Sequence, residues 1–263
     1  MFKARVLTAF VGIPVILFFI YCGGCWYGLA VSVIAVIGLR EYFRLMRKRP
    51  GATVELAAYI LVVLNLWMIF RGNLSHILAL WVLAFLVFCL FPVFSCSRTG
   101  YWESAISFWG IIYIGGLAGF LLAIRLLPDG LLFTILLFLM VWAEDILAYF
   151  VGSMFGKTLL VPKISPKKTW EGTIAGVTGS SLTGLLLPRF FSLSSFNLPA
   201  GFLLGLMIGT AATLGDLSQS ALKRTAGVKD SGQLLPGHGG VLDRFDSLFF
   251  AAPLFYFYIR YLL

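Results

Sequence analysis

Long apolar runs follow one another along almost the whole chain, and they limit what it can fold into. Nine such runs, separated by short polar segments, cover residues 6–21, 25–39, 53–70, 74–94, 105–127, 130–152, 172–187, 198–214 and 247–263. A helix of about 20 apolar residues crosses the hydrocarbon core of a bilayer. Backbone polar groups in lipid must be bonded within the protein, which favours helices. The sequence therefore predicts an all-α polytopic integral membrane protein with about nine transmembrane helices.

The composition excludes a soluble globular protein. Charged residues make up only 12% of the chain and hydrophobic residues 60%, whereas about a quarter of the residues in soluble domains are charged. The net charge of +9 suits nucleic acid or anionic lipid, but membrane orientation explains most of it, so we expect no nucleic-acid partner. The four cysteines and two distant histidines indicate neither a disulfide framework nor a zinc site.

The basic residues predict the orientation of the chain in the membrane. With a cytoplasmic N-terminus, the opposite side would hold only four of the twenty Lys and Arg residues: Arg71, Arg125, Arg189 and Arg260. Positive charge is concentrated in cytoplasmic loops, so we expect this orientation in the cytoplasmic membrane of the cell. We interpret the basic stretch 40–49 as an amphipathic anchor on anionic headgroups, with steering of an anionic lipid as the alternative.

One polar segment, residues 216–247, interrupts the apolar pattern. Its charged residues are Asp216, Lys223, Arg224, Lys229, Asp230, Asp243, Arg244 and Asp246. Charges between membrane spans are costly near lipid, so their default interpretation is functional. On a helix, one face would hold Asp216, Ser220, Lys223 and Arg224, and a second would hold Asp243 and Asp246. Aspartate carboxylates are typical ligands of Mg²⁺, and Lys and Arg side chains typically bind phosphate groups.

A glycine-rich turn lies inside this segment, at Pro236-Gly237-His238-Gly239-Gly240. It cannot be a regular helix, and its glycines allow the backbone to approach a ligand closely. Several N–H groups, including those of Gly239 and Gly240, can then point at an anion. His238 is a candidate donor to a phosphate or to the leaving group, and a structural hydrogen bond within the turn is the alternative.

Two further polar motifs precede this segment. The first places Glu144 and Asp145 inside an apolar run. Adjacent positions of a helix point about 100° apart, so we expect only one of them, Asp145, to face a site. The second is a basic loop, where a helix that begins near Thr169 would turn its free N–H groups toward phosphate, and Lys167 and Lys168 would add positive charge.

The polar segment resembles the signature of the phosphatidate cytidylyltransferases (CDP-diacylglycerol synthases). The similar residues, without a departure, are Ser220-Ala-Leu-Lys223-Arg224, Lys229-Asp230-Ser-Gly and Leu235-Pro-Gly-His238-Gly239-Gly240-Val-Leu-Asp243-Arg244-Phe-Asp246. Two further blocks are similar, one beginning at Asp145 and one running from Ser165 to Gly172. The first of these departs from the family at Ile146-Leu147, where Thr-Gly is expected, and at Ser153, where a basic residue is common.

The resemblance implies a nucleotidyltransferase of phospholipid biosynthesis that converts CTP and phosphatidate to CDP-diacylglycerol and diphosphate. The lipid phosphate would attack the CTP α-phosphorus, assisted by Mg²⁺, with a second metal ion left open. We assign as metal ligands Asp145, Asp216, Asp243 and Asp246. We assign as catalytic Asp216, Asp243, Asp246, Lys223 and Arg224. We assign to substrate or phosphate binding Lys167, Lys168, Thr169, Ser220, Lys229, His238, Gly239, Gly240 and Arg244.

We divide the chain into membrane scaffold spans (1–128) and a catalytic membrane region (129–263) with its site on the cytoplasmic side. CTP, phosphatidate and membrane lipids are the expected partners, and a glycine-lined protein of this size is a candidate homodimer. A transporter or channel is the rival function, disfavoured because the charges gather at one membrane face without an inverted repeat. A CTP-dependent lipid kinase, or a cytidylyltransferase for another lipid, would use similar residues, and substrate assays would separate them.

Overall fold

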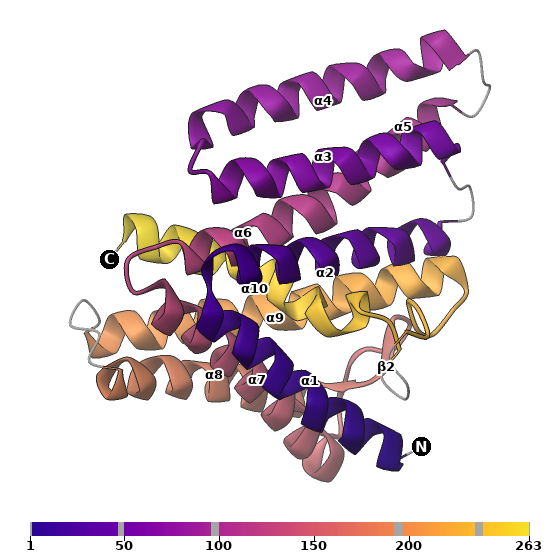
Figure 1. The fold of residues 1–263 in the computed structure, drawn as a ribbon. Coiled ribbons are helices and arrows are strands. Elements are labelled where there is room, and N and C mark those ends of the chain that lie inside the picture. The colour runs from indigo at the N-terminus through magenta and orange to yellow at the C-terminus, as the bar shows by residue number, and fades with distance from the viewer. Residues whose placement is uncertain (1, 47–49, 96–99, 192–196, 235–238, 263) are drawn as a thin grey trace. The chain divides into compact units, whose positions relative to one another are not determined.

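The computed structural model describes residues 2–46, 50–95, 100–191, 197–234 and 239–262, and its described part is mostly helical (Figure 1). The helices are α1 (Phe2–Cys22), α2 (Gly24–Leu45), α3 (Ala52–Phe70), α4 (Leu74–Ser95), α5 (Gly100–Gly110), α6 (Leu117–Arg125), α7 (Gly130–Phe155), α8 (Trp170–Phe190), α9 (Leu198–Ala226) and α10 (Leu242–Tyr261). A π-helical turn, η1 (Ile111–Gly116), joins α5 to α6.

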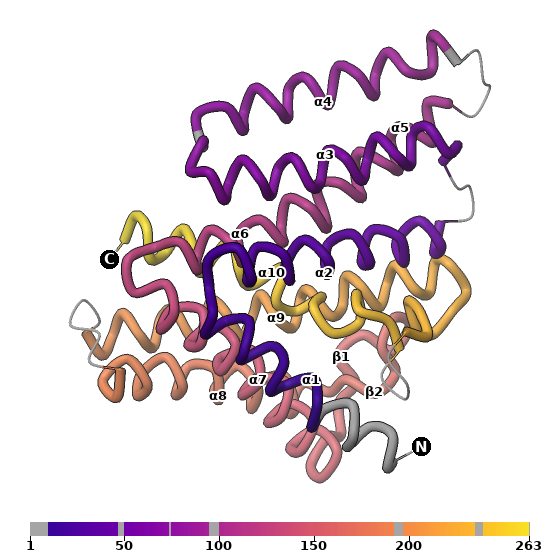
Figure 2. Tube along the Cα trace, in the orientation of Figure 1, coloured from indigo at the N-terminus to yellow at the C-terminus, as the bar shows by residue number. Residues whose placement is uncertain are grey.

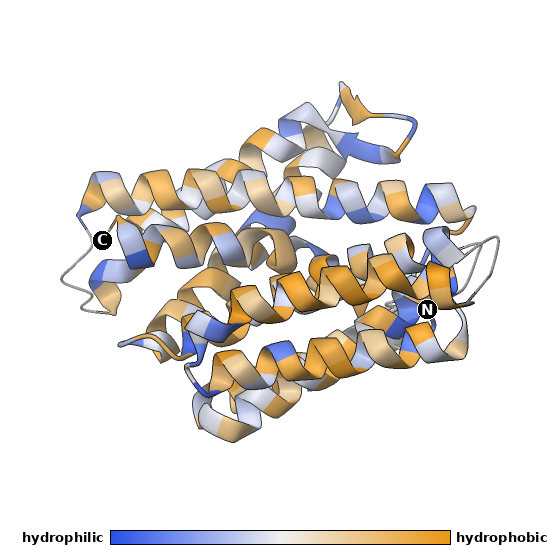
Figure 3. Cartoon of the chain, turned by 90° about the horizontal axis from the view of Figure 1, so that it is seen from above, coloured by the Kyte–Doolittle hydropathy of each residue, from blue (hydrophilic) through white to orange (hydrophobic). Residues whose placement is uncertain are grey.

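Five of the described helical stretches are long and apolar enough to cross a membrane. They cover Ala52–Phe70, Ser75–Phe94, Gly100–Arg125, Gly130–Phe155 and Leu198–Ala226. Hydrophobic residues dominate the helices, and hydrophilic ones gather in short stretches (Figure 3). The expected helical, multi-pass membrane protein is confirmed at this level, while nine spans and a cytoplasmic N-terminus stay predictions.

A short β-hairpin departs from the all-α expectation. Strand β1 (Leu159–Val161) pairs antiparallel with β2 (Ser165–Thr169), with Leu159 opposite Thr169. The turn between them is closed by a hydrogen bond from the Ile164 N–H to the Val161 carbonyl, at 3.1 Å. Pro162 follows Val161, and proline favours this turn position because its φ is already fixed there. The basic loop of the sequence analysis is therefore an ordered ribbon.

The chain divides into two compact units. Unit 1 contains residues 1–126 and 230–244, and unit 2 contains residues 127–229 and 245–263. The segment 230–244, which carries part of the polar signature, thus belongs with the N-terminal helices. The division at residue 128 into scaffold and catalytic regions was a functional one and stays a prediction.

In unit 1, polar side chains of two helices donate to backbone carbonyls of other elements. The Asn65 amide donates to the Gly115 carbonyl in the π-helical turn, at 3.3 Å. The Arg125 guanidinium donates through Nε to the Ile20 carbonyl near the end of α1, at 2.9 Å. The last carbonyls of a helix need such partners. Arg125 thus ties the end of α6 to the end of α1.

The predicted amphipathic anchor is wrong for the middle of the stretch 40–49. Residues 40–45 continue α2, and Glu41, Tyr42 and Phe43 are buried within unit 1. Only part of the basic stretch is exposed, including Arg40 and Arg44. Residues 47–49 lie outside the described part of the chain.

In unit 2, helices α7, α8 and α9 lie side by side (Figure 2). Glycines line the contacts: a Cβ at Gly172 would lie 2.6 Å from the Ala148 carbonyl oxygen of α7, and one at Gly209 would lie 2.9 Å from the Val177 Cα of α8. Small residues let helix backbones approach closely in membrane proteins. This packing brings the polar residues of α7 and α9 into reach of each other.

Candidate active site

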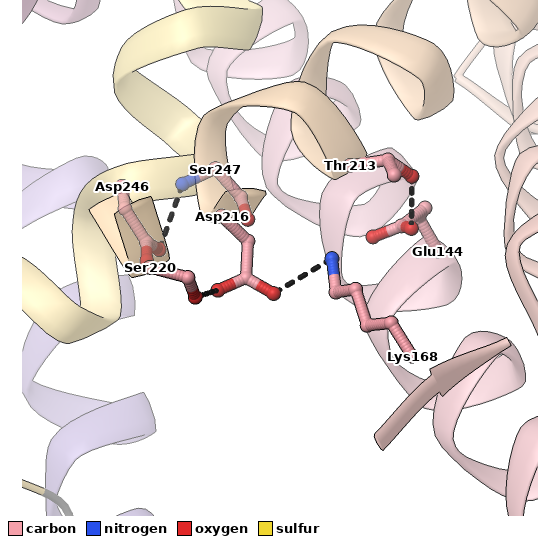
Figure 4. Close-up of polar contacts among 7 residues, drawn as sticks. All are labelled: Glu144, Lys168, Thr213, Asp216, Ser220, Asp246 and Ser247. Carbon is pink, nitrogen blue, oxygen red and sulfur yellow. Dashed lines mark hydrogen bonds and ion pairs between the residues drawn. The ribbon is translucent and has the colours of Figure 1, made fainter. Parts of the chain in front are cut away.

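Asp216 of α9 lies at the centre of the polar residues of unit 2. Its Oδ2 forms an ion pair with the Lys168 ammonium group of β2 at 2.7 Å, and both side chains are partly exposed (Figure 4). The Ser220 hydroxyl, one turn further along α9, lies 3.5 Å from Oδ1 of Asp216. The structure thus brings together three residues that the sequence analysis proposed for one site.

The hairpin positions Lys168 toward Asp216. Successive side chains of a strand point to opposite faces, so Lys168 is directed at α9 while Lys167 is exposed. Thr169 ends β2 and is the N-cap of α8, where its Oγ1 accepts a hydrogen bond from the Gly172 N–H at 3.2 Å. The predicted helix start near Thr169 is confirmed.

The prediction that the N–H groups at the start of α8 are free for phosphate is wrong for two of them. The Trp170 N–H donates to the Thr158 carbonyl at 2.9 Å, and the Gly172 N–H donates to Thr169. The Glu171 carboxylate in turn accepts from the Thr158 N–H at 3.2 Å. Its own backbone N–H, followed by that of Thr158, lowers the pKa of the Glu171 carboxyl. The contact of Thr169 with phosphate stays a prediction.

Glu144 is an acid that the sequence analysis did not assign to the site. Its side chain is 2% exposed, and its Oε1 accepts a hydrogen bond from the Thr213 hydroxyl of α9 at 2.7 Å (Figure 4). The neighbouring Asp145 is exposed and feels the charges of Asp216 and Lys168. Both acids of the pair thus belong to the polar residues of unit 2, and the cost of an acid inside an apolar run was the signal for Glu144.

Asp246 of α10 is buried beside the turn of α9 that carries Asp216. Its side chain is 6% exposed, and Oδ1 accepts a hydrogen bond from the Ser247 N–H at 2.8 Å. A Cβ at Gly215 would lie 2.7 Å from the Asp246 carbonyl oxygen. Glycine at this position therefore lets α10 pack directly on α9. We call Glu144, Lys168, Thr213, Asp216 and Asp246 (Figure 4), together with Asp145, the Asp216 centre.

The remaining predicted cations of unit 2 have different surroundings. Arg224 is exposed, and its guanidinium donates to the carbonyls of Ile164, at 3.2 Å, and Val228, at 3.3 Å. It therefore fastens the hairpin turn to the end of α9. Lys223 is half-buried and Lys229 is exposed. Their contacts with phosphate stay predictions.

Asp243 and the two described glycines of the turn belong to unit 1. The Asp243 Oδ2 accepts hydrogen bonds from the Ser231 N–H at 2.8 Å, the Ser231 hydroxyl at 2.9 Å and the Gly240 N–H at 3.0 Å. Gly239 has a φ of 83°, where a side chain is strained. Arg244 is exposed, and His238 lies outside the described residues. A common centre of Asp243 with Asp216 stays a prediction.

The chemistry of the donors in the Asp216 centre suits a divalent cation. Carboxylate oxygens are hard ligands of the kind that Mg²⁺ prefers. Asp216 repels both Asp145 and Asp246, and a cation would relieve this repulsion. Within the described residues, no group of three or more His, Cys, Asp and Glu side chains is arranged closely enough to hold a metal ion. The donors fit the ion by type and charge, whereas the described arrangement does not form a complete ligand shell.

Comparison with known proteins gives similarity along nearly the whole chain. Residues 3–262 match the Cytidylyltransferase family. A "Phosphatidate cytidylyltransferase" of Synechocystis sp. is 36% identical, with 98% of this chain and 97% of the relative covered. Proteins of the same name are 35% identical in Staphylococcus aureus, with 96% of each chain covered, and 36% identical in Haemophilus influenzae, with 98% and 99% covered.

Proposed function

The chain belongs to the cytidylyltransferase family, and we propose that the Asp216 centre is where its reaction takes place. The chain is a nucleotidyltransferase of phospholipid biosynthesis, and it converts CTP and phosphatidate to CDP-diacylglycerol and diphosphate. The observation that most directly supports the location is the ion pair of Lys168 with Asp216, next to the buried Asp246. It puts a phosphate-binding cation and cation-binding carboxylates side by side.

The proposed reaction is a single displacement at phosphorus. An oxygen of the phosphatidate phosphate attacks the α-phosphorus of CTP, and the bond from that phosphorus to the bridging oxygen of diphosphate breaks. The attacking group is already an anion, so no side chain has to remove a proton. Phosphoryl transfer of this kind depends on positioning and on neutralising charge. Lys168 is the cation placed to bind a phosphate oxygen, and Lys167 and Lys223 are further candidates.

We propose Mg²⁺ as the cofactor, with a second metal ion as an open possibility of the same centre. Asp145, Asp216 and Asp246 would hold it, and Asp243 completes the predicted ligand set. Bound there, the ion supplies charge neutralisation for the triphosphate and for the departing diphosphate. Lys168 neutralises Asp216 in the described structure, so we propose that this lysine exchanges the carboxylate for a phosphate oxygen when nucleotide binds.

We also propose the finer membrane arrangement. The chain crosses the cytoplasmic membrane nine times with its N-terminus in the cytoplasm, and CTP reaches the centre from that side. The unequal distribution of Lys and Arg supports this orientation. Labelling of single cysteines introduced at Asn73 and at Lys163 tests it. The first should react only from the outer side and the second only from the cytoplasmic side, and the reverse result would refute the proposal. A homodimer is proposed from the glycine content alone.

The reaction itself is tested with purified protein in detergent, radiolabelled CTP, phosphatidate and Mg²⁺. We expect a labelled CDP-lipid and diphosphate in equal amounts. Transfer of a terminal phosphate, with CDP as the product, would instead identify a lipid kinase. Binding of CTP without any product from phosphatidate would direct the search to another lipid.

A further inference from the structure

Glu41 of α2 is a buried acid of unit 1 that lies far from the signature in sequence and touches it in the structure. Its side chain is 3% exposed. Oε1 accepts a hydrogen bond from the Val241 N–H at 3.0 Å, and Oε2 accepts from the Leu242 N–H at 2.9 Å and from the Ser231 hydroxyl at 3.0 Å. Every one of these contacts brings a donor to Glu41. The two N–H groups can only donate, so Glu41 is an acceptor toward the backbone of residues 241 and 242.

The backbone donors to Glu41 lie at the beginning of α10. The first N–H groups of a helix have no partner within that helix, and negative charge is favourable there. A neighbouring residue in sequence usually supplies the cap. Here Glu41 of α2 supplies the cap for the N–H groups of residues 241 and 242, and Asp243 accepts from the Gly240 N–H just before the helix, at 3.0 Å. Two carboxylates together fix the first turn of α10.

Ser231 connects these two carboxylates. Its hydroxyl lies 3.0 Å from Oε2 of Glu41 and 2.9 Å from Oδ2 of Asp243, and its N–H also donates to Asp243 at 2.8 Å. A hydroxyl has one proton and donates it to one acceptor at a time. The side chain is 4% exposed, so water does not replace this link. We call Glu41, Ser231 and Asp243, with the backbone of residues 240–242, the Glu41 cluster.

Two glycines of the polar signature are required by the Glu41 cluster. A Cβ at Gly232 would lie 2.6 Å from Oε1 of Glu41. A Cβ at Gly240 would overlap Oε2 of Glu41 and the Ser231 hydroxyl. Real Cβ atoms do not approach other atoms so closely, and both neighbours are held by hydrogen bonds. These glycines thus admit a carboxylate of the protein itself, whereas the sequence analysis explained the glycine-rich turn by a bound anion.

We propose that Glu41 is a positioning residue for cytidylyl transfer. It fixes the first turn of α10. The orientation of this turn determines where the side chain of Asp243 points, and also that of Asp246, which lies three residues later on the same helix. The inference rests on the proposed function, in which these aspartates neutralise charge during the reaction. The contacts described for Glu41 are all with groups of the protein itself. Its loss should therefore reduce the rate of the chemical step more than the affinity for CTP.

The test compares Glu41→Gln and Glu41→Asp with the matched control Glu55→Gln. Glu55 lies on α3 of the same unit and accepts only the Tyr59 hydroxyl among the contacts described for it. The full-length protein in detergent is assayed for CDP-lipid formation, for stoichiometric binding of labelled CTP and for thermal unfolding. The rate is expressed per CTP-binding site, which removes any unfolded fraction from the comparison.

We expect kcat of Glu41→Gln to fall about 10- to 100-fold, since misplacing catalytic groups by about 1 Å costs on the order of 100-fold. The KM for CTP should change less than about 3-fold, because Glu41 has no contact with the nucleotide. Glu41→Asp should lose more than Glu41→Gln, because the shorter side chain does not reach the N–H groups of residues 241 and 242. Glu55→Gln should retain the wild-type kcat.

Three results would overturn the proposal. They are a kcat of Glu41→Gln within 2-fold of the wild type, a loss that disappears when rates are expressed per CTP-binding site, or a better rate for Glu41→Asp than for Glu41→Gln. The last result would show that charge matters and geometry does not. If Glu41→Gln does not fold, Ser231→Ala removes only the link between the carboxylates and should lower kcat about 3- to 10-fold. An unchanged kcat in that variant would equally refute the proposal. Wild-type protein that makes no CDP-lipid would contradict the proposed function instead.

Discussion

The Asp216 centre of unit 2 and the Glu41 cluster of unit 1 both bury carboxylates in an apolar protein, but they satisfy them differently. In the Glu41 cluster, N–H and O–H donors of the protein surround Glu41 and Asp243 at 2.8 to 3.0 Å. In the Asp216 centre, acids repel each other, and Lys168 of the hairpin neutralises Asp216. Fixed donors make Glu41 part of the architecture, whereas uncompensated negative charge leaves the carboxylates of the Asp216 centre able to bind a cation.

Removal of divalent metal should have the largest effect on turnover. It should abolish the function of the Asp216 centre and leave the structure held by Glu41 unchanged. With EDTA we expect turnover to be lost, because the carboxylates of the Asp216 centre then have nothing to neutralise the triphosphate. The melting temperature should change by less than about 3 °C, since Glu41 holds the start of α10 through protein donors. Turnover and melting are measured before and after EDTA, and after excess Mg²⁺ is returned. Full turnover in EDTA would refute a metal role for the Asp216 centre.

Asp246→Asn should reduce turnover nearly as much as removal of the metal ion. It keeps the shape of the buried side chain but removes its charge, so we expect a fall in kcat of more than about 100-fold, with the protein still folded. Turnover is measured over a range of Mg²⁺ concentrations. Near-normal turnover at limiting Mg²⁺ would remove Asp246 from the metal ligands and would make it architectural, like Glu41 of unit 1.

Lys168→Ala and Lys167→Ala form a matched pair on one strand. Lys168 faces Asp216 and Lys167 is exposed on the other side of β2. We expect kcat/KM for CTP to fall about 100-fold in Lys168→Ala, and only about 2- to 5-fold in Lys167→Ala, because only the first lysine is held at the centre. Steady-state rates with varied CTP give the comparison. Equal losses would show that the hairpin contributes general positive charge rather than a placed cation.

Thr213→Val should have the smallest effect, and mainly on stability. It leaves the buried Glu144 carboxylate without its hydroxyl donor, which costs about 1–3 kcal/mol. The matched control is Thr210→Val, because the exposed Thr210 hydroxyl bonds only the Leu206 carbonyl of its own helix in the described structure. Thermal unfolding should show a decrease of several degrees for Thr213→Val and almost none for Thr210→Val. Equal melting temperatures would mean that Glu144 does not depend on α9.

Sequence patterns predicted what depends on neighbours along the chain. The helical spans followed from apolar runs of membrane-crossing length. The start of α8 followed from Thr169 as a capping residue, which accepts a bond from a residue three positions away. The position of Asp216 and Ser220 on one helical face was predicted from their spacing of four residues. The family followed from the fixed polar positions of the signature, and the comparisons confirm it.

The tertiary structure alone decided which distant groups meet. Sequence placed Glu41 in a basic anchor, since nothing nearby suggests that its partners lie 200 residues later. Likewise, no local pattern connects Glu144 with Thr213, 69 residues apart. The helix period predicts the face on which a side chain lies. The hydrogen-bond partner of a buried carboxylate depends on which other elements pack around it. The sequence thus determined the membrane helices and the chemistry of this protein, and the fold determined which acids remain available for that chemistry.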